Sequence, residues 1–162
     1  MQGLAALSEY LILCILHLMK YMGIDYGTKR IGVAVTDDGG TIAFPKVIFG
    51  NTPKLFDELL DIIKNESIGG IVVGKSMDTH GNRNAIMDDI DAFVEELEKL
   101  SGKKIHMEEE RFTSHFLKSF DFSKGLEKKI SRNRVKKPAS QAIDAQAAAS
   151  ILQRFLEGKK SH

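Results

Sequence analysis

The chain has 162 residues, of which 43% are hydrophobic and 28% are charged, and its formal net charge is +1. This composition is typical of one soluble globular domain that is long enough to bury a core. The single cysteine, Cys14, excludes an internal disulfide framework and a zinc site built from cysteines. It also suits a reducing compartment, so we expect the protein to be cytoplasmic.

The positive charge is concentrated in one segment. Residues 124–137, "KGLEKKISRNRVKK", carry seven Lys or Arg and one Glu, a local charge of +6 that leaves −5 for the rest of the chain. A compact basic segment on an otherwise acidic chain favours a polyanionic partner. A solvated loop without a partner is an equal alternative for a charge run alone.

An apolar run, "YLILCILHLM", occupies residues 10–19. It is too short to span a bilayer, which takes about 20 residues, and it lacks the preceding positive charge of a signal peptide. Apolar residues of the segment recur at the spacing of an amphipathic helix: Leu4, Leu7, Leu11, Cys14 and Leu18. Met19 is an alternative start of the protein, and we favour this interpretation, with residues 1–18 as an extension outside the core.

Three strands are expected next, at residues 20–27, 30–37 and 41–50. Residues 27–29 form a tight link between the first two, and residues 37–40, "DDGG", are a turn signal before the third. Pro45 marks the third strand as an edge strand or the position of a bulge. Short links between consecutive strands predict an antiparallel meander.

The apolar period then changes to that of helices. The spacing predicts a helix over 51–67, with Asn51 or Thr52 as its cap, and a second helix over 84–102 that ends at Gly102. Strands are expected after each of these helices, and a last helix after a loosely patterned region at 111–137. These three elements lie at residues 69–74, 103–109 and 138–158.

A meander followed by βαβ units predicts an α/β fold, with a mixed five-stranded sheet flanked by helices. The chain shows no internal repeat and no linker of low complexity. We therefore expect a single domain over residues 19–158, with residues 159–162 as a tail.

Acidic residues fall where these elements should be buried. Asp25 interrupts the apolar run of the first strand near its carboxyl end, and three glutamates at 108–110 end the fifth strand. In the last helix, Asp144 begins an apolar stripe that continues through Ala148, Ile151, Leu152 and Phe155. Ligand sites of α/β sheets lie outside the carboxyl ends of parallel strands, so these acids are expected to meet at one edge.

Asp25, Asp144 and either Glu109 or Glu110 would repel one another at that edge, and a divalent cation such as Mg²⁺ removes the repulsion. Two such ions about 4 Å apart can activate a water and stabilise a leaving oxygen in phosphodiester hydrolysis. Each acid also has an ordinary interpretation, as a turn residue, a solvated strand end or an exposed helical residue. The hypothesis of a metal site therefore depends on their combination with the nearby basic segment.

The chain resembles the YqgF/RuvX family of small bacterial proteins over residues 19–157. The resemblance lies in four ordered blocks: "GIDYGTKRIGVAVTD", "IVVG" with the following loop that contains Gly81, "EERFTS" and "IDAQAAASILQ". It implies the RNase H-like fold. The family is described as a nuclease of the 5′ end of pre-16S rRNA and also as a Holliday junction resolvase.

The family's acidic triad, transferred by motif, falls on Asp25, Glu110 and Asp144, which would be both the catalytic residues and the ligands of Mg²⁺ or Mn²⁺. Glu109 is a further candidate ligand. The chain departs from the family pattern after the fourth strand, where Lys75-Ser76 replaces a Leu-Pro pair, and in a longer basic block with Pro138. Both departures bear on substrate preference rather than on the triad.

Basic side chains are expected to contact substrate phosphates as positioning groups. They are Lys29, Arg30, Lys75, Arg83, Arg111, Lys128, Lys129, Arg132, Arg134, Lys136 and Lys137. The expected substrate is structured RNA, such as a pre-rRNA, or branched DNA, with no membrane partner. The sequence leaves the choice between RNA and DNA open, and also that between monomer and homodimer.

Two other functions remain as alternatives. One is an ATP-dependent enzyme, because "DYGTKRIGVAV" also resembles the first phosphate-binding segment of the actin and sugar-kinase fold. A single domain lacks the second half that would close over ATP, which argues against it. The other is a nucleic-acid-binding module without catalytic activity.

Overall fold

The computed structural model of the protein describes residues 19–76, 85–109 and 139–160, with only the backbone at 139–143 and at Lys160. Its strands form one sheet in the order β3-β2-β1-β4-β5. The strands are β1 (Tyr21–Tyr26), β2 (Arg30–Thr36), β3 (Ala43–Gly50), β4 (Gly70–Lys75) and β5 (Ile105–Glu109). β1, β2 and β3 pair antiparallel, whereas β4 lies parallel to both β1 and β5. The predicted mixed sheet, a meander followed by βαβ units, is confirmed.

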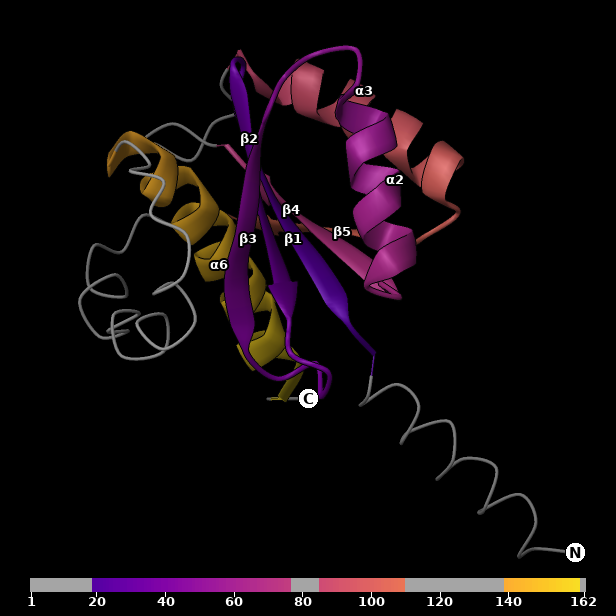
Figure 1. The fold of residues 1–162 in the computed structure, drawn as a ribbon, viewed down its shortest axis with the longest axis vertical. Helices are drawn as coiled ribbons and strands as arrows, with labels where there is room; N and C mark the ends of the chain where they lie inside the picture. Colours follow the sequence, from indigo (N-terminus) through magenta and orange to yellow (C-terminus); the bar gives the residue numbers. More distant parts are fainter. Residues whose placement is uncertain (1–18, 77–84, 110–138, 161–162) are drawn as a thin grey trace, which may run out of the picture.

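Helices cover both faces of the sheet. α2 (Leu55–Asn65) and α3 (Met87–Ser101) lie on one face, and α6 (Ala139–Lys160) crosses the other (Figure 1). Alternation along β1 assigns its side chains to these faces. Ile24 belongs to the core under α2 and α3, whereas Tyr21 belongs to the core under α6. None of the described helices is both long enough and apolar enough to cross a membrane.

α6 packs close to the sheet because the facing residues of β1 and β2 include glycines. A Cβ atom added to Gly23 of β1 would lie 2.7 Å from Cβ of Leu152 and 2.8 Å from the carbonyl oxygen of Ala148. Ala34, Ala148 and Leu152 are fully buried in this interface. The stripe predicted from Ala148 onwards is therefore the face that α6 buries.

The ends of the helices differ partly from the prediction. α3 ends at Gly102, which adopts the left-handed conformation with φ of 62°, as expected. α6 does not end at Gly158 but continues to Lys160, and Lys159 donates a hydrogen bond to the hydroxyl of Tyr21. A glycine costs a helix only about 1 kcal/mol, so this contact can offset it.

α2 begins at Leu55 rather than at residue 51, so the predicted Asn51 or Thr52 cap is wrong. Lys54 occupies the cap position and makes no side-chain cap hydrogen bond. Asn51 instead turns back to the link between β1 and β2, where its amide donates to the carbonyl oxygen of Gly27 and to the hydroxyl of Tyr26. The Asn51 side chain, which the local sequence predicts as a helix cap, thus forms hydrogen bonds with residues that are distant in sequence.

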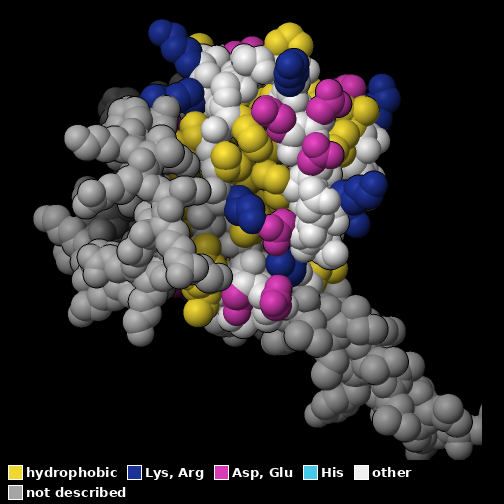
Figure 2. Space-filling view, in the orientation of Figure 1, with side chains coloured by type: hydrophobic (Ala, Val, Ile, Leu, Met, Phe, Trp, Pro, Cys, Tyr) yellow, Lys and Arg dark blue, Asp and Glu magenta, His cyan; other side chains and the backbone are white. Residues whose placement is uncertain are grey.

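β3 is an edge strand, and its register with β2 shifts between Val33 and Ala34, next to Pro45. This agrees with the prediction from Pro45. Phe44 of β3 and the preceding Ile42 are exposed by 43% and 41%. Figure 2 shows hydrophobic side chains gathered between β3 and α2 on this face, with basic and acidic side chains interleaved around them. The described part of this face therefore has no continuous basic surface that would suit a nucleic acid.

Candidate active site at the carboxyl ends of the parallel strands

Asp25 lies near the carboxyl end of β1, and its side chain is half-buried. It pairs directly with Gly32 of β2. Residues that pair directly across a sheet share a face, and Gly32 lies under α6. Asp25 therefore lies on the face that α6 covers, at the edge where β4 and β5 also end.

α6 brings a second carboxylate to this place. A Cβ atom on Gly32 would lie 2.1 Å from the backbone oxygen of Asp144, so the backbone of Asp144 rests on the residue opposite Asp25. Directly paired Cα atoms are only about 4.5–5.5 Å apart, so two acids that are 119 positions apart in the chain become neighbours across one strand pair. The Asp144 side chain is 26% exposed, and its Oδ2 lies 2.9 Å from Nε of Arg30.

Of the two candidate glutamates, Glu109 ends β5 and is described by the structure. His106 pairs with Val72 in the α6-side core, and its ring contacts that of Phe155 on α6 at 4.8 Å. Alternation from His106 leaves Glu109 on the opposite face from Asp25. Its carbonyl oxygen accepts a hydrogen bond from Nη1 of Arg154 at 2.6 Å. Glu110, Arg83, Arg111 and the basic residues at 128–137 lie outside the described residues.

Within the described ranges, no group of three or more His, Cys, Asp or Glu is gathered to hold a metal ion. Asp25 and Asp144 supply two carboxylates at this edge, and a third ligand would come from outside those ranges. Half-buried carboxylate oxygens are the donors that Mg²⁺ and Mn²⁺ prefer. The two acids therefore fit such an ion by chemical type.

The link between β1 and β2 presents two of the expected phosphate contacts, Lys29 and Arg30, which are both exposed. Asn51 braces this link, because its N–H donates to the carbonyl oxygen of Lys29 at 3.0 Å and its amide to that of Gly27 at 3.3 Å. Lys75, at the end of β4, is half-buried. Sequence reasoning missed the role of Asn51, and no local pattern distinguishes it from a helix cap.

His106 of β5 packs against α6, and its pKa is altered. Burial lowers the pKa of His106 below 6.5, and the positive charges of Lys104 and Lys159 lower it further. The imidazole is therefore neutral at pH 7 and packs against Phe155 as a ring. His106 pairs with Val72 in the interior of the sheet rather than at the edge that holds Asp25, so its position does not indicate a catalytic role.

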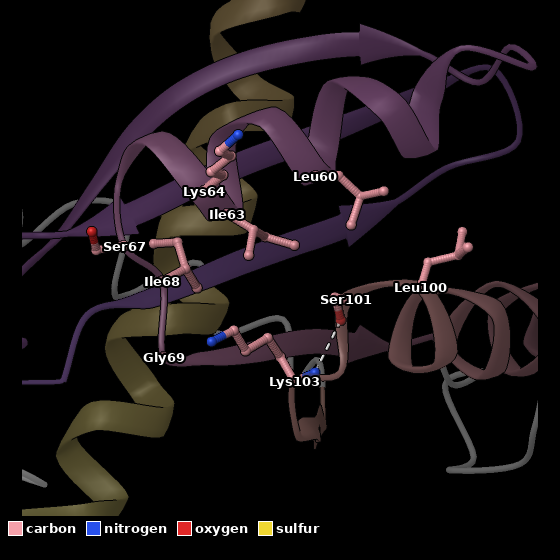
Figure 3. Close-up of a pocket in the computed structure, with 9 residues that line it drawn as sticks. All are labelled: Leu60, Ile63, Lys64, Ser67, Ile68, Gly69, Leu100, Ser101 and Lys103. Atoms are coloured by element: carbon pink, nitrogen blue, oxygen red, sulfur yellow. Dashed lines mark hydrogen bonds between the residues drawn. The ribbon is translucent and has the colours of Figure 1, made fainter.

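A pocket of about 480 Å³ lies at the other edge of the sheet, where β4 and β5 begin (Figure 3). Residues from the ends of α2 and α3 line it together with the chain before each strand: Leu60, Ile63, Lys64, Ser67, Ile68, Gly69, Leu100, Ser101 and Lys103. No carboxylate is among these described lining residues, and the pocket lies at the opposite end of β4 from the edge that holds Asp25. The pocket is thus separate from the candidate active site.

The strand order and the acids at the strand ends define the class of protein, an RNase H-like α/β domain. The structure is similar to that of RuvC from T. thermophilus in complex with a Holliday junction substrate, with a TM-score of 0.53 and 12% identity, covering 88% of this chain and 96% of that one. It is also similar to the Fowlpox virus resolvase bound to Holliday junction DNA, with a TM-score of 0.51 and 14% identity, covering 86% and 98%. At these identities the similarity concerns the fold alone.

The family is defined by sequence. The model described as "RuvX: Holliday junction resolvase" matches residues 19–158. A protein of Oleidesulfovibrio alaskensis is 34% identical over 140 residues, covering 85% of this chain and 92% of its own length. A protein of Anaplasma marginale is 34% identical over 144 residues, covering 87% and 86%. Each of the two carries the name "Putative pre-16S rRNA nuclease".

The chain therefore belongs to the RuvX family, as its sequence blocks predicted. Membership identifies the class of enzyme, a hydrolase that acts on phosphodiester bonds.

Proposed function

We propose that this protein is a divalent-metal-dependent nuclease that cleaves structured nucleic acid, and that it processes the 5′ end of pre-16S rRNA in the cytoplasm. The observation that carries the proposal is the contact between Gly32 and the backbone of Asp144, opposite Asp25. It gathers two carboxylates at the edge of the sheet where α/β proteins bind their ligands. The names of the similar proteins supply the substrate.

Asp25 and Asp144 would hold the metal ion together with Glu110. When bound, Mg²⁺ or Mn²⁺ would activate a water and stabilise the leaving oxygen of the phosphodiester. Lys29 and Arg30 would hold the phosphate groups in position. The hydrogen bond from Asn51 to the carbonyl oxygen of Lys29 would hold the backbone from which both side chains extend. No side chain needs to form a covalent intermediate in this chemistry.

A second candidate function is the resolution of Holliday junctions, which the description of the matching family model favours. Symmetric cleavage of a junction requires two active sites related by a two-fold axis, and thus a homodimer. Processing of a single RNA end needs only a monomer. The oligomeric state in solution therefore bears directly on the choice of substrate.

The experiment is a cleavage assay with a 5′-extended 16S RNA fragment and a four-way DNA junction, each with Mg²⁺, Mn²⁺ or EDTA. We expect metal-dependent cleavage of the RNA by the wild type and none by Asp25→Asn, which should keep its circular dichroism spectrum and melting temperature. Asp57→Asn is the matched control, because Asp57 is exposed on α2, across the sheet. An active Asp25→Asn variant would refute the metal site. Binding of either substrate without cleavage under every condition would favour the non-catalytic module.

A further inference from the structure

An ion pair ties one of the two carboxylates of the candidate site to an arginine. Nε of Arg30 lies 2.9 Å from Oδ2 of Asp144, and the two side chains are 44% and 26% exposed. A guanidinium has five N–H donors, and this pair uses the one on Nε. Arg30 thus engages Asp144 from the solvent side of the site.

The backbone of both residues of this pair is held by packing and by strand pairing. Arg30 begins β2 and shares a face with Gly32, two residues further along, on which the backbone of Asp144 rests. The preceding link is braced by the hydrogen bond from Asn51 to Lys29. A rotation of either side chain, without a movement of the sheet or of α6, is therefore sufficient to separate the pair.

We infer that Arg30 competes with the divalent cation for the Asp144 carboxylate and turns to a substrate phosphate when the cation binds. The inference rests on the proposed function. A cation with two charges and a guanidinium on one carboxylate repel each other strongly in a half-buried site. A phosphate is as good a partner for the guanidinium as a carboxylate, so the displaced side chain gains a new contact. Arg30 is thus a positioning residue that couples metal binding to substrate binding.

The first test measures Mn²⁺ binding to the full chain by isothermal titration calorimetry. Arg30→Gln should bind Mn²⁺ roughly tenfold more tightly than the wild type, because the competing charge is gone. Arg30→Lys keeps the charge and should stay within about threefold of the wild type. Lys46→Gln is the control for net charge. Lys46, on β3, pairs with Glu66 at the end of α2 rather than with Asp144, so the Mn²⁺ affinity of this variant should not change.

The second test measures RNA binding against salt concentration, with and without Mn²⁺. The wild type should show a steeper salt dependence with Mn²⁺, by about one unit of slope, because Arg30 then contacts a phosphate. Arg30→Gln should lack this Mn²⁺-dependent increment. A merely structural role of Arg30 would not produce a difference that depends on the metal.

The outcomes separate this inference from the proposed function. If the wild type binds Mn²⁺ and cleaves RNA while Arg30→Gln binds Mn²⁺ equally or more weakly, competition is overturned and the nuclease assignment stands. If neither protein binds Mn²⁺ at millimolar concentration, the metal site and the competition both fail. Thermal melting of each variant shows whether it is folded, and Arg30→Lys provides the comparison if Arg30→Gln is not.

Discussion

Gly32 determines how closely α6 can approach the acidic end of β1. Its hydrogen leaves room for the backbone of Asp144, where a methyl group would lie 2.1 Å from a carbonyl oxygen. Backbone atoms cannot move aside as the end of a flexible side chain can. A glycine in a strand normally weakens the sheet, and here it is the condition for bringing Asp144 beside Asp25.

Gly32→Ala should therefore push the first turns of α6 away from β2 and separate the two carboxylates. We expect a loss of about 1–3 kcal/mol in unfolding free energy, typical of overpacking, and at least about a tenfold loss of cleavage rate. Urea denaturation and the RNA cleavage assay measure both effects. Gly158→Ala is the control, since a Cβ there meets nothing within 4 Å, and it should raise stability by about 0.5–1 kcal/mol without changing cleavage. Full activity of Gly32→Ala would show that the contact does not determine the site.

At the scale of elements, a small ion-pair network joins three segments at the edge of the sheet opposite the acids. Glu66, at the end of α2, lies within ion-pair distance of Lys20, just before β1, and of Lys46 on β3. The hydrogen bonds from Lys46 and then from Lys20 lower the pKa of Glu66 below 4.5. Hydrogen bonds to Asp38 and Glu66 raise the pKa of Lys20 above 10.5.

Because the pKa of Glu66 is lowered in the folded protein, its contribution to stability is present above about pH 4.5 and is lost as the pH falls through the folded value. Glu66→Gln should therefore reduce the unfolding free energy by about 0.5–1 kcal/mol at pH 7 and by less at pH 3. Urea titrations at the two pH values measure the difference. Glu96→Gln removes only an exposed pair with Lys99 at 3.9 Å, and should change little at either pH. An equal loss for Glu66→Gln at both pH values would contradict the prediction.

The basic segment at 124–137 lies outside the described residues, so its role remains a prediction from sequence. Replacing four of its residues by Ala should weaken RNA binding and flatten its salt dependence by about one unit of slope for each lost phosphate contact. These residues are Lys128, Lys129, Arg132 and Arg134. A matched variant removes four lysines from the side of α2 and α3, namely Lys54, Lys64, Lys99 and Lys103. Equal salt slopes for the two variants would mean that the segment does not contact the substrate.

At the scale of the whole molecule, Met19 packs against the core between the sheet and α6. The Met19 side chain packs over Gly69, where an added Cβ would lie 2.2 Å from its Cγ atom. This contact and the pairing of Tyr21 with Gly70 attach the start of β1 to β4. The described core thus includes Met19 and the residues that pair with the first strand.

We propose that residues 1–18 are dispensable. A truncated chain that begins at Met19 should unfold at the same urea concentration as the full chain, cleave RNA at the same rate and be more soluble. If the segment instead docks as an amphipathic helix, truncation should cost several kcal/mol, at about 1.5–3 kcal/mol for each large apolar side chain that is uncovered. A clear drop in the unfolding midpoint would decide for docking.

The sequence alone determined the elements, the order of the meander and the βαβ units, and the family. Those features depend on local periods, turn residues and motifs, such as the change to a helical period after the third strand and the glycine that ends α3. It also indicated that Asp144 lies on the buried stripe of the last helix. Local patterns are sufficient here because a strand or helix displays its faces within a few residues.

Only the tertiary structure decided which groups meet. The contact of Asp144 with Gly32, the pair between Arg30 and Asp144 and the use of Asn51 as a brace all join residues that are remote in sequence. Gly158 stays helical for a similar reason, because Lys159 reaches the hydroxyl of Tyr21. Long-range contacts can offset a local conformational preference of about 1 kcal/mol, such as that of glycine against a helix. A local sequence pattern does not show which distant residue makes the contact.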